Sequence, residues 1–191
     1  SLRAAASQAH PSQYRLLSVV ATSGSFLELL RQICLQLGAP PVTNSTARLL
    51  ALIREALGDI CAKKQIPVLL IDEAHLMRLE VFAELHTLAQ QNFDSRSLLP
   101  VVLSGHTALV AKLRSPTSRP FASRIVGRTH LEALQRDHMA AYLTHHLTIA
   151  GGHEQLFSEE AVTAIHQSSG GLLRRAGSLA RGALLAAARE K

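Results

Sequence analysis

The stretch Val68-Leu69-Leu70-Ile71-Asp72-Glu73-Ala74-His75 decides the fold of this chain. Four consecutive apolar residues follow Pro67 and run directly into two adjacent carboxylates. A short run that is apolar at every position predicts a strand buried on both faces, as in the middle of a parallel sheet. Functional residues of open α/β sheets lie at the carboxyl ends of the strands. We therefore expect Asp72 and Glu73 to take part in function, and a buried strand that ends in an exposed Asp-Glu turn is the alternative.

Strand and helix patterns alternate along the first two thirds of the chain. Besides the central strand, the patterns predict strands over 14–20, 100–104 and 125–131, and helices over 26–37, 46–63, 79–91 and 107–113. This alternation is typical of βαβ units and a parallel sheet. From there on only helical patterns remain, over 137–150, 159–167 and 172–189. We therefore expect an α/β core over 1–131 and a small helical domain over 132–191.

Composition restricts the classes of function. The chain has 191 residues and is 47% hydrophobic, which argues against disorder. Only 4% of the residues are aromatic and none is Trp, which disfavours base-stacking platforms. The net charge of +6 suits a polyanion such as a nucleotide, nucleic acid or anionic lipid, and a mildly basic protein without such a partner is the alternative. Because the two cysteines have no metal or redox spacing and no apolar run could span a membrane, we expect a cytoplasmic protein.

The apolar run that ends in Asp72 and Glu73 resembles the Walker B motif of P-loop ATPases. The resemblance implies that Asp72 would hold Mg²⁺, directly or through water. Glu73 would polarise the water that attacks the γ-phosphate of ATP. Two acids are needed because a hard cation prefers an anionic oxygen, whereas an attacking water needs a positioned base.

Further stretches, with the α/β core and the helical part, resemble the ExeA/TniB-type branch of the AAA+ ATPases. These stretches are 102–109, 121–125, 156–161 and 170–175. The branch holds secretion-associated ATPases and the ATPase helpers encoded beside transposases. By this resemblance His106, or else Ser104, would be sensor 1, which orients the attacking water or touches the γ-phosphate. Arg124 would be the arginine finger for a nucleotide held by a neighbouring subunit, and Arg174 would be sensor 2, which closes a helical lid onto the phosphates.

The phosphate-binding loop of this family, Gly-x-x-x-x-Gly-Lys-[Ser/Thr], does not occur in the sequence. We therefore expect an α/β fold with a parallel P-loop NTPase (AAA+) sheet that lacks its first strand and P-loop, followed by a small helical lid. In this fold the missing strand lies between the strands expected at 100–104 and 125–131. Leu2-Arg3-Ala4-Ala5 resembles the helix that follows the P-loop, so we expect the chain to start just after that loop.

The resemblance implies an ATP-driven switch with ATP and Mg²⁺ as cofactors. It would form a homo-oligomer on DNA through non-specific backbone contacts and recruit or activate a transposase. The polar loop at 92–97 and the short helical lid favour this reading. One alternative is a secretion-pathway ATPase, and another is a non-catalytic remnant without a P-loop. His75 is expected to be a solvent-facing residue at a helix start, and a relay of the nucleotide state is the alternative.

Overall fold

A computed structural model of the chain describes residues 2–91, 96–97, 99–152 and 156–189. The chain divides into two compact units, Ser1–Gly127 and Arg128–Lys191. Among the residues that the structure describes, none of the helices combines the length and the apolarity needed to cross a membrane.

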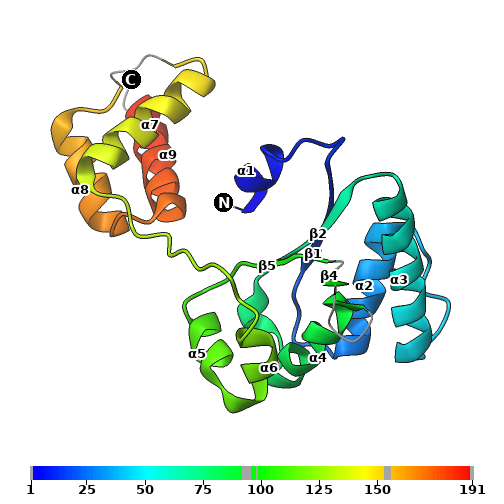
Figure 1. Ribbon diagram of the computed structural model, residues 1–191. Coiled ribbons are helices and arrows are strands. Elements are labelled where there is room, and N and C mark those ends of the chain that lie inside the picture. The colour runs from blue at the N-terminus through cyan, green and yellow to red at the C-terminus, as the bar shows by residue number, and fades with distance from the viewer. Residues whose placement is uncertain (1, 92–95, 98, 153–155, 190–191) are drawn as a thin grey trace. The chain divides into compact units, whose positions relative to one another are not determined.

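A three-stranded parallel sheet of order β1-β2-β5 lies at the centre of the first unit (Figure 1). Its strands are β1 (Tyr14–Val20), β2 (Ile66–Asp72) and β5 (Val101–Leu103). The predicted central strand is confirmed, because β2 pairs with both neighbours and its residues Leu69 and Ile71 are fully buried. The register places Val20 of β1 beside Asp72, and Leu103 of β5 beside Ile71. The carboxyl ends of the three strands therefore lie at the same edge.

β2 begins earlier than the apolar run predicts, and it includes Pro67. Proline has no backbone N–H and is normally confined to the ends or edges of sheets. Here Pro67 is the register partner of Arg15 in β1. The pairing with β5 starts only at Leu69, whose N–H donates to the Pro100 carbonyl over 2.9 Å. Among the described strands, β2 is therefore paired on one side only at the level of Pro67.

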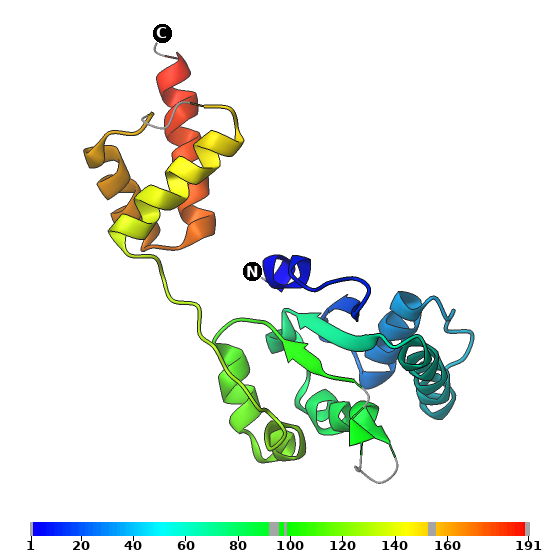
Figure 2. The ribbon, with the colours of Figure 1, turned by 45° about the horizontal axis from the view of Figure 1, so that its top comes forward.

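Helices and two 3-10 turns connect and cover these strands. They are α1 (Leu2–Ser7), α2 (Phe26–Leu37), α3 (Thr46–Ala62), η1 (Ala74–Leu76), α4 (Leu79–Ala89), α5 (Ala108–Arg114), η2 (Pro116–Ser118) and α6 (Arg119–Ala122). α2 and α3 pack on each other and against β1 and β2, respectively, whereas α6 packs against α4 and α5. In both views α2 and α3 lie on one side of this unit and α5 and α6 on the other (Figures 1 and 2). The amphipathic patterns are confirmed, because the periodic apolar residues of α2 and α3 are buried in the core.

The ends of two helices have distinct local features. Ser25 precedes α2, but its side chain makes no capping hydrogen bond. The helix predicted over 79–91 ends at Ala89, and β3 (Gln90–Gln91) then pairs antiparallel with β4 (Arg96–Ser97). Residues 92–95 of the expected polar loop lie outside the described residues.

The strand predicted over 125–131 is not formed, and residues 125–135 contain neither helix nor strand. Val126 is fully exposed and Leu131 is 79% exposed. An extended segment becomes a strand only when a neighbour pairs with its backbone groups. In the structure, no described strand pairs with this segment. The prediction was wrong because an apolar pattern reflects only the residues of the segment itself. Whether a neighbouring strand pairs with that segment cannot be read from the pattern.

The second unit is helical, as predicted, and contains α7 (Arg136–Ile149), α8 (Glu159–Ser169) and α9 (Leu173–Arg189). A small core joins the three helices through Met139 of α7, Ile165 of α8 and Ala176 of α9. Ser158 caps α8, because its hydroxyl oxygen accepts the Ala161 N–H over 3.3 Å. The second unit therefore has a hydrophobic core of its own and a helix capped by its own residues.

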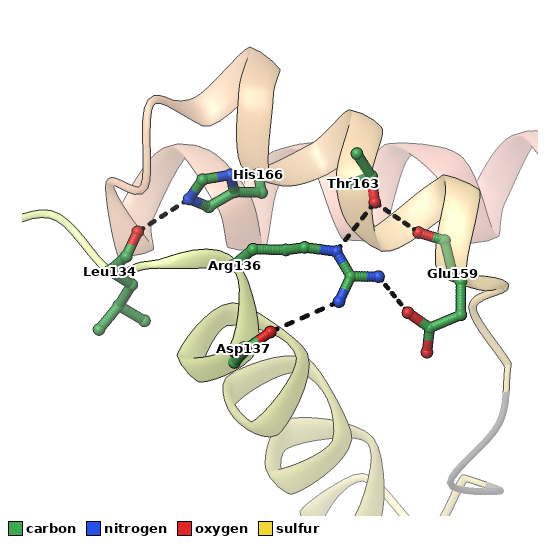
Figure 3. A network of polar contacts seen from close by, with 6 residues as sticks. All are labelled: Leu134, Arg136, Asp137, Glu159, Thr163 and His166. Atoms are coloured by element: carbon green, nitrogen blue, oxygen red, sulfur yellow. Dashed lines mark hydrogen bonds and ion pairs between the residues drawn. The ribbon is translucent and has the colours of Figure 1, made fainter.

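A polar network fastens the start of α7, and Leu134 just before it, to α8 (Figure 3). The Arg136 guanidinium donates to the Thr163 hydroxyl oxygen over 3.1 Å and pairs with the Glu159 carboxylate. This carboxylate raises the pKa of Arg136 through a hydrogen bond and through its charge. Two residues before Arg136, the Leu134 carbonyl accepts a hydrogen bond from Nε2 of His166 in α8 over 2.9 Å. These contacts fix the start of α7 against one face of α8.

Candidate functional site

Asp72 and Glu73 stand at the carboxyl end of β2, as the sequence predicted. The Asp72 carbonyl accepts the Ala21 N–H from the segment after β1 over 2.8 Å. The Ser104 carbonyl, directly after β5, accepts the Ala74 N–H over 2.8 Å. The segment after β2 is therefore held between the segments that leave the two neighbouring strands.

Glu73 adopts a left-handed backbone conformation, with φ 52° and ψ 30°. This region is uncommon for residues with a Cβ. Its N–H donates to Oδ1 of Asp72 over 2.9 Å, which supports the sharp turn out of the strand. Conformations of this kind concentrate at functional sites, where the surrounding structure enforces them. The strained residue is thus the one proposed from the sequence to act on water.

The donor chemistry at this edge fits Mg²⁺ that is shared with a phosphate. Within the described ranges, no group of three or more His, Cys, Asp or Glu could hold a metal ion by protein atoms alone. Mg²⁺ commonly uses one or two carboxylates together with waters and substrate phosphates. Asp72 supplies one carboxylate, whose Oδ1 also accepts the Glu73 N–H over 2.9 Å.

His75 lies between Glu73 and the segment that follows β5. Its Nδ1 is 3.4 Å from Oε2 of Glu73, and it also accepts the backbone N–H of His106 over 3.2 Å. The side chain is only 22% exposed, so the expectation of a solvent-facing residue is wrong. Gly105 permits the close approach, because a Cβ at this position would lie 3.1 Å from the backbone nitrogen of His75.

Both candidates for sensor 1 lie on this same segment. His106 is exposed, and its Nδ1 accepts the Ala108 N–H over 3.4 Å. A neutral ring that accepts at Nδ1 carries its proton on Nε2, so Nε2–H is the donor that His106 can offer. Ser104 is half-buried, and its N–H donates to the Ile71 carbonyl over 2.9 Å. Of the two side chains, His106 is the more accessible to a ligand.

The two predicted arginines lie on other elements. Arg124 follows α6 and is exposed, and its Nη1 donates to the Pro120 carbonyl over 2.7 Å. Arg174 lies in the first turn of α9, in the second unit, and is also exposed. The structure of one chain does not test whether Arg124 acts on a neighbouring subunit. It also does not test whether Arg174 contacts a phosphate, so both roles stay predictions.

Sequence reasoning missed two cations that fasten the segment after β2. Lys112 of α5 donates to the Met77 carbonyl over 2.6 Å. Arg78 Nε donates to the Ser23 carbonyl, in the turn after β1, over 2.8 Å. These partners are 35 and 55 residues apart in the chain, so no local pattern indicates them.

The close approach between His75 and the segment after β5 had one sign in the sequence. This sign is Gly105, a glycine two residues beyond β5.

Comparisons with known proteins agree with this arrangement. A family described as an AAA domain matches residues 1–113. General secretion pathway protein A of Aeromonas hydrophila is 32% identical over 179 residues. The aligned part covers 93% of this chain and 32% of that protein, so the chain spans about a third of the relative's length.

Two solved structures share the fold. The ORC2 protein of Aeropyrum pernix in its ADP form aligns with a TM-score of 0.66 and 15% identity, over 99% of this chain and 52% of that one. Cdc6p from Pyrobaculum aerophilum aligns with a TM-score of 0.60 and 19% identity, over 80% of this chain and 40% of that one. The parallel three-stranded sheet and the helical part that follows it therefore match the AAA+ fold of the Cdc6 and ORC proteins.

Proposed function

Because this chain belongs to the AAA domain family, we propose that it binds Mg–ATP and hydrolyses it at the carboxyl edge of β2. The observation that carries the proposal is the placement of the two acids. Asp72 and Glu73 leave the central strand directly beside the segment that contains Ser104 and His106. Adjacent acids at this edge can serve a cation and a water at the same time.

The two acids have different tasks in this proposal. Asp72 would hold the magnesium ion of Mg–ATP, directly or through water. Glu73 acts as the general base that takes a proton from the attacking water. Bound magnesium supplies neutralisation of the phosphate charge. His106 orients the water or a phosphate oxygen through its Nε2–H donor.

The two arginines supply positive charge from outside this edge. Arg124 acts on the nucleotide of a neighbouring subunit, which makes the active form a homo-oligomer. Arg174 brings the helical unit onto the phosphates. Charge stabilisation is the main requirement of phosphoryl transfer, and an arginine supplied in trans meets it.

A secretion pathway is the cellular setting that the comparisons favour. The similarity to general secretion pathway protein A covers 93% of this chain and includes both units. The comparisons lend no support to the DNA and transposase partners expected from the sequence, and we do not propose these partners. The proposal is therefore a secretion-type AAA ATPase.

The experiment that tests the proposal is a fluorescent nucleotide titration of two chains. One is the 191-residue chain, and the other carries a P-loop and its strand ahead of residue 1. We expect Mg–ATP to bind tightly only to the second chain, because the sequence given contains no P-loop.

In the second chain, Glu73→Gln should bind Mg–ATP without turnover, because the amide fills the space of the carboxylate but cannot take the proton. Asp72→Asn should weaken the dependence of binding on magnesium. If neither chain binds nucleotide, the proposal is wrong, and Asp72 and Glu73 only terminate a strand and have no catalytic role.

A further inference from the structure

We propose that His75 is a positioning residue that links the 104–106 segment to Glu73 through one ring nitrogen. The inference rests on the proposed hydrolysis at Glu73 and adds a control to that site. Nδ1 of His75 faces two partners, the His106 backbone N–H at 3.2 Å and Oε2 of Glu73 at 3.4 Å.

A single nitrogen cannot satisfy both partners at once. To accept the His106 N–H, Nδ1 must present its lone pair, which places the ring proton on Nε2. To bind the Glu73 carboxylate, which only accepts, Nδ1 must carry a proton. The neutral ring therefore has two alternatives, and each one excludes the other.

These alternatives differ in what they leave to Glu73. When Nδ1 accepts the His106 N–H, His75 makes no hydrogen bond to Glu73, and the carboxylate can take a proton from water. When the 104–106 segment withdraws, Nε2 loses its proton to solvent and Nδ1 gains one, with no change in ring charge. Nδ1–H then donates to Oε2, and this oxygen is no longer available to take a proton from water.

The surroundings of His75 keep the ring in place during this exchange. The Ala74 N–H donates to the Ser104 carbonyl over 2.8 Å, immediately beside His75. On the other side, Lys112 and Arg78 anchor the chain at Met77 and Ser23. The anchors at Met77 and Ser23 do not involve the 104–106 segment, and the Ala74–Ser104 bond keeps the Ser104 end of that segment in place. A movement of His106 therefore changes the partner of Nδ1 and leaves His75 where it is.

His106 is the proposed contact to the nucleotide, so a 104–106 segment that is seated against His75 holds His106 where it can reach the phosphates. His75 converts that position into the availability of Glu73. The expected result is that hydrolysis proceeds only while the segment that carries His106 is seated against His75.

The first measurement uses the 191-residue chain and needs no nucleotide. ¹⁵N NMR of the histidine rings should show His75 with an unprotonated Nδ1 and a proton on Nε2. The side-chain oxygen of Asn can take the position of Nδ1, whereas that of Gln takes the position of Nε2. The His106 amide proton shift should therefore stay near that of the wild type in His75→Asn and move in His75→Gln and His75→Ala. A proton on Nδ1 at neutral pH, or an amide shift indifferent to all three changes, overturns the inference.

The second measurement uses the chain that carries the P-loop. His75→Ala and His75→Gln should lower kcat about tenfold, because the segment that carries His106 loses the acceptor that seats it, with little change in the Kd of Mg–ATP. His75→Asn should restore most of the lost kcat, because its side chain can present either an acceptor or a donor at the Nδ1 position. Equal kcat in the wild type, His75→Gln and His75→Ala overturns the inference.

Gly105→Ala provides a second route if a change at position 75 unfolds the chain. The new methyl group would lie 3.2 Å from Nδ1 of His75, and it should displace the segment while His75 is retained. We expect the same shift of the His106 amide and the same loss of kcat, and wild-type values for both would contradict the coupling. Absence of hydrolysis in the wild-type chain with a P-loop would instead overturn the proposed function and leave the NMR result standing.

Discussion

The backbone of Glu73 has a cost that can be measured apart from catalysis. At φ 52° a residue with a Cβ is less stable by about 1–2 kcal/mol than in the right-handed region. Glycine avoids this penalty but loses more chain entropy on folding. We therefore expect Glu73→Gly to raise the free energy of unfolding in urea by up to about 1 kcal/mol, and to abolish hydrolysis in the chain that carries the P-loop.

Lys64 offers a matched control for this prediction. It is exposed, follows the end of α3 and has φ 61°, but it lies outside the proposed site. Lys64→Gly should give a similar gain in stability and leave hydrolysis unchanged. If Glu73→Gly is less stable than the wild type while Lys64→Gly is more stable, the turn at Glu73 is held by its side chain and carries no net strain.

At the scale of elements, the corner between α8 and α9 depends on one glycine. Gly171 has φ 74°, and a Cβ there would overlap the Leu134 carbonyl oxygen. Gly170 has φ 60°, but a Cβ there would meet no atom within 4 Å. Gly170→Ala should therefore cost about 1 kcal/mol, from the backbone alone, and Gly171→Ala at least about 2 kcal/mol. Urea unfolding followed by circular dichroism measures both, and equal losses would contradict the steric account.

The first turn of α8 predicts a dependence of stability on pH. Glu160 lies in this turn, and its carboxylate accepts hydrogen bonds from its own backbone N–H and from the Ser158 hydroxyl. These hydrogen bonds lower the pKa of Glu160 below 4.5. A carboxyl with a lowered folded-state pKa stabilises the fold above its unfolded pKa, and this stabilisation is lost as the pH falls through the folded value. The wild type should thus exceed Glu160→Gln in stability at pH 7, and the difference should close below pH 4.5. A difference that is constant between pH 7 and pH 3 would contradict this origin.

Local patterns were sufficient for elements whose burial is visible in their own residues. The apolar run at 68–71 identified the central strand, and the rule for strand ends placed Asp72 and Glu73 at the carboxyl edge of the sheet. The 125–131 segment failed because strand formation depends on a partner elsewhere in the chain. The contact between His75 and His106 joins residues 31 apart, and the left-handed turn at Glu73 has no residue signature, so neither could be predicted.

At the scale of the whole molecule, the role of Arg124 requires more than one copy. Arg124→Ala subunits keep Glu73 but offer no finger, whereas Glu73→Gln subunits offer the finger but have no base. In chains that carry the P-loop, each variant alone should hydrolyse little ATP, and mixing them should restore activity because the defects lie in different copies. A phosphate-release assay over a range of mixing ratios measures this. No recovery in mixtures that assemble would contradict action in trans.

Pro67 disfavours a shifted register of β2 along β5 that could otherwise form during folding. A slide of β2 by two residues along β5 would keep the same faces buried, so hydrophobic burial alone would not prevent it. That slide would bring Pro67 opposite Val101, where it has no N–H to give to the ladder. It would also carry Asp72 about 7 Å beyond its present level against Ser104. The proline therefore protects the alignment of the acids from the opposite end of their strand.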